Sequence, residues 1–100
     1  MDFSVDTTID GKKLTAKVNG PLNSINSPLL LKELEDKIPD IDELVFDFKD
    51  MPYTSSAGVR VILLFLQTIE DHGTMKLINV NDDVKELLDT IGFLDMLSVE

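Results

Sequence analysis

The chain has 100 residues, of which nine are basic and nineteen acidic, so its formal net charge is −10 at pH 7. This length predicts a single domain over residues 1–100, and the 43% of hydrophobic residues suffices for a core. The charge disfavours direct binding to nucleic acids or anionic membranes, and the lack of cysteine excludes disulfides, thiolate metal sites and cysteine nucleophiles.

Two strands open the chain, because apolar and polar residues alternate over residues 3–9 and again over residues 14–18. Asp10-Gly11 between them has the chemistry of a hairpin turn, so we expect the strands to pair antiparallel. Asn19-Gly20-Pro21 ends the second strand.

A first helix follows, with Ser27 as its expected N-cap and Pro28 at its first position. Apolar residues then recur at helical spacing as far as Ile38, and Pro39 is expected to end the helix.

The second half alternates strands and helices. Residues 44–48 are nearly all apolar, which is typical of a central strand buried on both faces. A long helix is expected over residues 57–72, closed by Gly73, and a strand over residues 75–80.

A last helix is predicted to begin after Asn81 as N-cap and to end at Gly92. Its expected buried stripe consists of Val84, Leu87, Leu88 and Ile91. The residues expected to fold back onto the core after it are Phe93, Leu94, Met96 and Leu97. The order is therefore β-β-α-β-α-β-α, with right-handed parallel crossovers in the later part.

No catalytic apparatus is evident. The only histidine, His72, lies sixteen residues after Ser56 on the long predicted helix, about 24 Å away at ~1.5 Å per residue, so it cannot activate that serine. No glycine-rich phosphate loop occurs either. We therefore expect neither enzymatic activity nor a cofactor.

The acidic residues also lack the spacing of a known site. The cluster before the central strand consists of Asp36, Asp40, Asp42 and Glu43, and it lacks the pattern of a calcium loop. Asp47 and Asp50 could suggest a phosphoacceptor carboxylate, but the acidic pair and lysine of receiver domains are missing. We expect no metal site.

The segment Met51–Arg60 is the most informative part of the chain. It places Thr54, Ser55 and Ser56 between a buried strand and a long helix, where one hydroxyl would suffice as N-cap. Gly58 near the start of a helix costs about 1 kcal/mol relative to alanine, which indicates either a close approach to the backbone there or a requirement of helix–strand packing alone.

The helix after this segment allows two interpretations. Its apolar side consists of Val59, Ile62, Phe65, Leu66 and Ile69. Leu63 and Leu64 fall beside the polar positions Arg60, Gln67 and Asp71. They extend a wide buried face, or they form an apolar contact patch beside the hydroxyl residues.

Phe46-Asp47-Phe48, followed by residues 53–63, resembles the core motif of STAS domains, the anti-sigma factor antagonist family. Gly20-Pro21-Leu22-Asn23 is similar to the turn after the family's second strand, and residues 91–97 resemble its closing segment. The resemblance implies an α/β fold with a four-stranded mixed sheet and three to four helices.

The resemblance also implies a function. Stand-alone bacterial members bind an anti-sigma factor that is a serine kinase and thereby free the sigma factor. The kinase phosphorylates a serine two positions before the motif glycine, here Ser56, and a PP2C-type phosphatase reverses this. Ser55 stands where many members have aspartate, and Ser55 and Thr54 are the secondary phosphorylation candidates.

The expected contacts with a protein partner come from Asn23, Ser55, Ser56, Gly58, Arg60, Leu63 and Leu64. The alternative is a STAS subunit of a lipid transport or sensory complex that is not switched by phosphorylation. The start of the chain does not resemble a signal peptide, and the longest apolar run, Val61–Leu66, cannot span a membrane. We therefore expect a cytoplasmic protein without membrane insertion.

Overall fold

The computed structural model describes residues 3–92 and 98–99. Its elements are β1 (Ser4–Asp10), β2 (Lys13–Asn19), α1 (Ser27–Leu34), the 3-10 turn η1 (Ile38–Asp40), β3 (Glu43–Asp47), α2 (Ser56–Ile69), β4 (Thr74–Ile78), α3 (Asp82–Ile91) and β5 (Ser98–Val99). This arrangement confirms the predicted order β-β-α-β-α-β-α and adds a two-residue strand that the sequence did not indicate.

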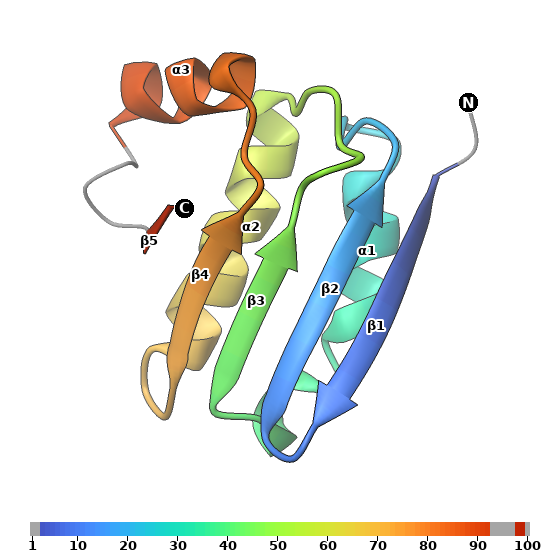
Figure 1. Ribbon diagram of the computed structural model, residues 1–100, viewed down its shortest axis with the longest axis vertical. Helices are drawn as coiled ribbons and strands as arrows, with labels where there is room; N and C mark the ends of the chain where they lie inside the picture. Colours follow the sequence, from blue (N-terminus) through green and yellow to red (C-terminus); the bar gives the residue numbers. More distant parts are fainter. Residues whose placement is uncertain (1–2, 93–97, 100) are drawn as a thin grey trace.

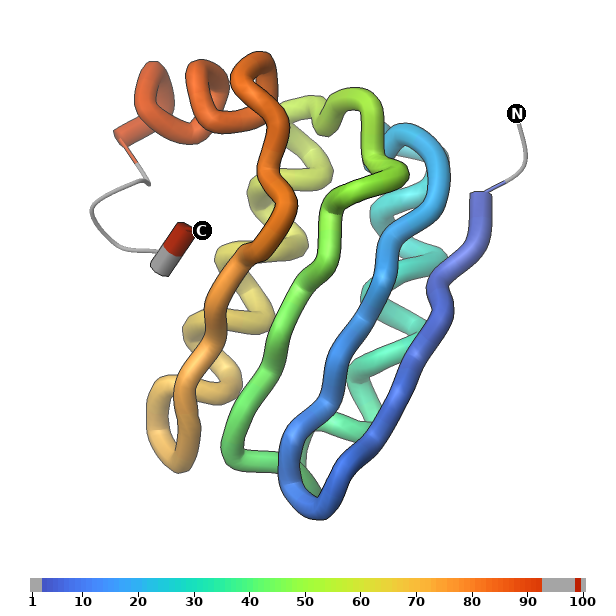
Figure 2. Tube along the Cα trace, in the orientation of Figure 1, coloured from blue at the N-terminus to red at the C-terminus, as the bar shows by residue number. Residues whose placement is uncertain are grey.

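The strands form one sheet in the order β1-β2-β3-β4-β5, so β3 is central as predicted. β1 is antiparallel to β2, and the remaining neighbours are parallel. Helices α1 and α2 cover one face of the sheet, whereas α3 lies beyond the end of β4 (Figure 1). The tube in Figure 2 shows that the loops after β2, β3 and β4 meet along one edge, which positions the candidate site.

The core lies between the sheet and the helices α1 and α2. Sheet residues that point into it include Leu14, Ala16, Val18, Leu44, Phe46, Met75 and Leu77. The Phe46 ring lies 5.7 Å from the ring of Phe48 and 5.7 Å from that of Phe65 on α2. Val45 on the other face is only 2% exposed, which confirms that β3 is buried on both faces.

Local signals explain several element boundaries. Asp10 pairs with Lys13 across a two-residue turn in which Gly11 has φ +62°, so the predicted hairpin is confirmed. The side chain of Asn81 caps α3 by accepting from the Val84 N–H at 2.8 Å. Gly92 ends α3 in the left-handed conformation at φ +90°.

The ends of the first two helices differ from the prediction. Ser27 is not the N-cap of α1: it lies inside the helix, and its hydroxyl donates to the carbonyl oxygen of Asn23. Helix α1 ends at Leu34, and Pro39 lies instead in the separate turn η1. A proline is tolerated in the first turn of such a helix, and Pro39 is the second residue of η1.

Helix α2 begins at Ser56, one residue before the predicted start, and ends at Ile69 rather than His72. Gly73 was predicted to close this helix, but the structure gives another reason for a glycine there. A Cβ at this position would overlap the backbone of Asp42. The Thr74 N–H donates to the Asp42 carbonyl at 2.9 Å, which draws the two segments together. The expected packing of Phe93, Leu94, Met96 and Leu97 falls outside the described residues.

Candidate partner-binding site

The loop between β3 and α2 is held in place by the turn that follows β2. The Gly20 N–H donates to the Asp50 carbonyl at 3.0 Å, and the Leu22 N–H donates to the Tyr53 carbonyl at 3.1 Å. The Leu22 carbonyl in turn accepts from the Ser55 N–H at 2.9 Å. The start of α2 is thus fixed by backbone hydrogen bonds from a segment more than thirty residues earlier.

The adjacent hydroxyl residues have different environments. Thr54 is 6% exposed, and its Oγ1 donates to the Leu22 carbonyl at 2.9 Å. Ser55 is the N-cap of α2, and its Oγ accepts from the Gly58 N–H at 3.4 Å. Ser56 is the first residue of α2 and is exposed. Of these three residues, only Ser56 is exposed, since Ser55 is half-buried.

Gly58 is buried because the Leu22 turn packs directly against it. A Cβ at this position would lie 2.5 Å from the Leu22 carbonyl oxygen and would overlap Thr54 Oγ1. The close approach expected from the sequence thus comes from the protein itself. Gly58 can affect a partner only by keeping this turn in shape, not by direct contact.

Asn23 has a structural role that the sequence did not reveal. Its Oδ1 accepts from the N–H groups of Ile25 at 3.0 Å and Asn26 at 2.9 Å, and its carbonyl accepts from the Ser27 N–H at 2.8 Å. Asn23 therefore shapes the turn that leads into α1, but it is not the N-cap, because both N–H groups precede the helix. Its loop lies beside the Ser56 turn, as the parallel bridge between Leu22 and Thr54 shows.

A second anchor comes from the loop after β4. The Asn81 side-chain amide donates to the carbonyls of Met51 and Pro52, both at 3.2 Å. Since the same side chain caps α3, one residue joins that helix to the loop carrying the hydroxyl residues. The start of α2 is therefore held between the loops after β2 and β4.

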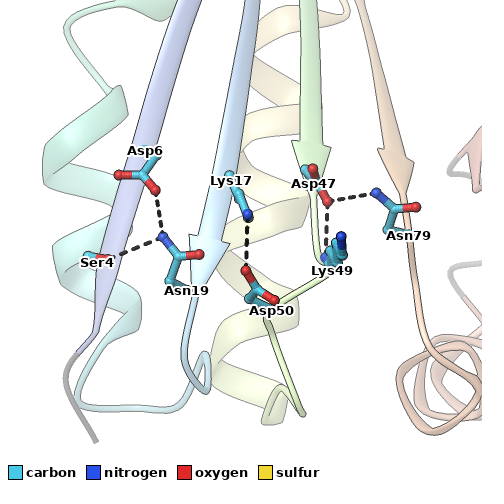
Figure 3. Close-up of polar contacts among 8 residues, drawn as sticks. All are labelled: Ser4, Asp6, Lys17, Asn19, Asp47, Lys49, Asp50 and Asn79. Carbon is cyan, nitrogen blue, oxygen red and sulfur yellow. Dashed lines mark hydrogen bonds and ion pairs between the residues drawn. The ribbon is translucent and has the colours of Figure 1, made fainter.

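Charged and polar side chains also interact at the ends of β2, β3 and β4 from which these loops leave (Figure 3). Asp47 Oδ1 accepts from the Lys49 N–H at 3.0 Å and from the Asn79 side chain at 2.9 Å. Asn79 has a left-handed backbone with φ +57°, which asparagine tolerates. Partial burial would raise the pKa of Asp47, but the hydrogen bonds from Asn79 and Lys49 and the charge of Lys17 hold that pKa below its ordinary value.

Asp50 makes an ion pair with Lys17, with Nζ and Oδ2 3.0 Å apart (Figure 3). The hydrogen bond to Asp50 and its negative charge raise the pKa of Lys17. Asp47 and Asp50 are thus engaged in holding the strand ends and the loop between β3 and α2. This environment agrees with a structural role for both carboxylates.

A groove of about 270 Å³ lies beside Ser56, between α2 and the end of α3. The described residues that line it are Ser56, Val59, Arg60, Leu63 and Ile91. Ile91 is 37% exposed and lines this groove, so its predicted place in the buried stripe of α3 is wrong. Ile91 is the last residue of α3, and its side chain lines the groove instead of the core.

Leu63 and Leu64 of α2 do not belong to the buried core. Leu63 is half-buried and lines the groove, and Leu64 is 43% exposed. Of the two interpretations of this helix, the structure favours an apolar patch over a wholly buried face. Together with Ser56 and Arg60, these leucines form the exposed side of α2, which we call the α2 surface.

A model of the STAS domain matches residues 4–100, which is nearly the whole chain. The chain belongs to the STAS family. It is 33% identical over 93 residues to BtrV of Bordetella bronchiseptica, which carries the description of an anti-sigma factor antagonist. That match covers 91% of this chain and 79% of BtrV.

Solved structures of this family share the fold. An anti-sigma factor antagonist from Mycobacterium paratuberculosis superposes with a TM-score of 0.89 at 11% identity, covering 98% of this chain and 85% of the other. The antagonist SpoIIAA in its phosphorylated form superposes with a TM-score of 0.76 at 14% identity, covering 99% and 91%. Homologues of this STAS protein are thus described as antagonists, a class of non-enzymatic regulator, in agreement with the prediction.

Two exposed residues beside the α2 surface were absent from the predicted contacts. Tyr53, directly before the hydroxyl residues, is 51% exposed, and Ile25 in the loop after β2 is 79% exposed. The sequence signal for Tyr53 was an aromatic residue directly before the three hydroxyl residues. Both add apolar surface at the same edge of this STAS protein.

His72 follows the end of α2 opposite Ser56, with Nε2 3.2 Å from the Ile38 carbonyl. Within residues 3–92 and 98–99, no group of three potential ligands lies close enough to hold a metal ion. None of the helices in these ranges has the length and apolar character needed to cross a bilayer.

Proposed function

We propose that this protein is an anti-sigma factor antagonist that acts in the cytoplasm. It binds an anti-sigma factor serine kinase through the α2 surface and is switched off when that kinase phosphorylates Ser56. A PP2C-type phosphatase restores the active form. The observation that carries this proposal is the exposed hydroxyl of Ser56 at the start of α2, beside a groove that Arg60 and Leu63 also line.

The relatives support the proposal. BtrV is described as an anti-sigma factor antagonist, and SpoIIAA is known in both an unphosphorylated and a phosphorylated structure. The different environments of the hydroxyl residues support the choice of Ser56. Thr54 already donates to the Leu22 carbonyl from a buried position, and Ser55 caps α2. Phosphorylation of either residue would disturb a hydrogen bond at the start of α2.

Phosphorylation at Ser56 would block the partner without unfolding the antagonist. The N-terminus of a helix carries partial positive charge and favours a nearby phosphate, so the effect on stability should be about 1 kcal/mol or less. The phosphate adds roughly −1.5 to −2 charge at the proposed contact. Burying it against a partner without a matching cation costs several kcal/mol, enough to reduce affinity by orders of magnitude.

The test combines phosphorylation with binding. Incubation with the anti-sigma factor kinase and ATP, followed by mass spectrometry of the peptides, should locate one phosphate on Ser56. Ser56→Ala should bind the kinase constitutively, and Ser56→Asp should bind it more weakly. The matched control is Ser24→Ala, which removes another exposed hydroxyl of the same edge and should change neither result.

Phosphate on Ser55 or Thr54 with Ser56 unmodified would refute the assignment. A protein that binds no anti-sigma factor and accepts no phosphate would instead support the alternative, a STAS subunit of a lipid transport or sensory complex.

A further inference from the structure

Arg60 is the only arginine of a chain whose net charge is −10. It is exposed, lies one turn after Ser56 on α2, and lines the same groove. Between described residues, ion pairs join lysines 13, 17 and 37 to carboxylates, so Arg60 is held in no ion pair within that part of the chain. Its guanidinium is therefore available for another anion.

The geometry of a helix directs Arg60 towards Ser56. Side chains four residues apart are neighbours, with about 5–6 Å between their Cβ atoms. Helical side chains also lean towards the N-terminus, so the long Arg60 side chain extends over the turn that begins with Ser56. The other described residues of the groove, Val59, Leu63 and Ile91, are apolar and offer no competing charge.

We infer that Arg60 binds the phosphate of phosphorylated Ser56 within the same chain. This inference rests on the proposed phosphorylation of Ser56. A guanidinium presents its N–H groups in a planar fork that matches two phosphate oxygens, which a lysine ammonium cannot do. Among the described residues that line the groove beside Ser56, no other side chain could serve as this ligand.

This contact gives the switch a second component. In the unphosphorylated protein Arg60 is free to contact the partner, as expected for the α2 surface. After phosphorylation the same guanidinium is occupied by the phosphate. The partner then meets an added negative charge and also loses the one arginine that it could have bound.

The test installs phosphoserine at position 56 during synthesis, so it needs neither the kinase nor the partner. Phosphorus NMR follows the second ionisation of the phosphate with pH. In the otherwise native chain, the midpoint of this titration should lie about half a pH unit below that in Arg60→Gln, because the nearby cation favours the dianion. Arg60→Lys should recover only part of the difference.

The matched control is Lys32→Gln on α1, which removes one exposed positive charge elsewhere. Its titration should follow that of the native chain. Equal midpoints in the native chain and Arg60→Gln would overturn the inference, as would an equal effect of Lys32→Gln, which would indicate only the overall charge. The proposed function fails separately, if the kinase leaves Ser56 unmodified while the installed phosphate still responds to Arg60.

Discussion

Replacing Gly58 by alanine should have two opposite effects on the free energy of unfolding, one from helix propensity and one from packing. In an exposed helix this change would stabilise the fold by about 1 kcal/mol. Here the new Cβ would lie 2.5 Å from the Leu22 carbonyl oxygen and would overlap Thr54 Oγ1. Neither group can move freely, because the Leu22 carbonyl also accepts from the Ser55 N–H.

The packing costs should win. Moving the Thr54 hydroxyl breaks its buried hydrogen bond to Leu22, a loss of about 1–3 kcal/mol, and overpacking costs about 1–3 kcal/mol more. We expect Gly58→Ala to lower the free energy of unfolding by about 1–5 kcal/mol, measured by denaturant unfolding.

Two further measurements separate the causes. Comparing Gln67→Gly with Gln67→Ala at an exposed position of α2 gives the propensity difference alone. Thr54→Ala removes one of the overlapping atoms, so the loss caused by Gly58→Ala should be smaller in that background. A Gly58→Ala protein as stable as the wild type would refute the packing argument and leave the glycine without this explanation.

Two more outcomes are expected. Leu64→Ala should weaken binding to the anti-sigma factor and hardly change the melting temperature, because Leu64 is 43% exposed. The control Ile62→Ala, in the core, should lower the free energy of unfolding by about 2–5 kcal/mol. Unfolding caused by Leu64→Ala would show that this leucine belongs to the core. Asp47 has a lower pKa in the folded protein than in the unfolded chain, so its ionised form stabilises the fold above the unfolded pKa, and this contribution disappears as the pH falls through the folded pKa. The stability of Asp47→Asn should therefore approach that of the wild type in acid, measured by unfolding at several pH values. A stability difference that does not change with pH would refute this assignment.

The features that the sequence revealed depend on neighbouring residues. Alternation over residues 3–9 and 14–18, with Asp10-Gly11 between them, was enough for the hairpin. The continuous apolar run at residues 44–48 identified the central strand. These patterns predict the structure correctly because each depends only on residues within one turn or one strand.

What the sequence did not reveal depends on contacts between distant segments. Ser27 looked like an N-cap, but Asn23 supplies the acceptor for the preceding N–H groups and leaves Ser27 inside the helix. Ile91 has the helical spacing of a buried residue, yet at the end of α3 it lines the groove beside Ser56. Gly58 indicated that some group packs closely against the start of the helix, but the sequence did not identify that group as Leu22.

The N-cap at Ser55 bears on which residues could replace one another at this position. Serine and aspartate cap helices about equally well, since both offer a side-chain oxygen to the free N–H groups of the first turn. The aspartate that many STAS proteins carry here and Ser55 of this chain can therefore do the same structural work. Exchanging serine and aspartate at this position therefore preserves the cap that holds the first turn of α2, in which Ser56 lies.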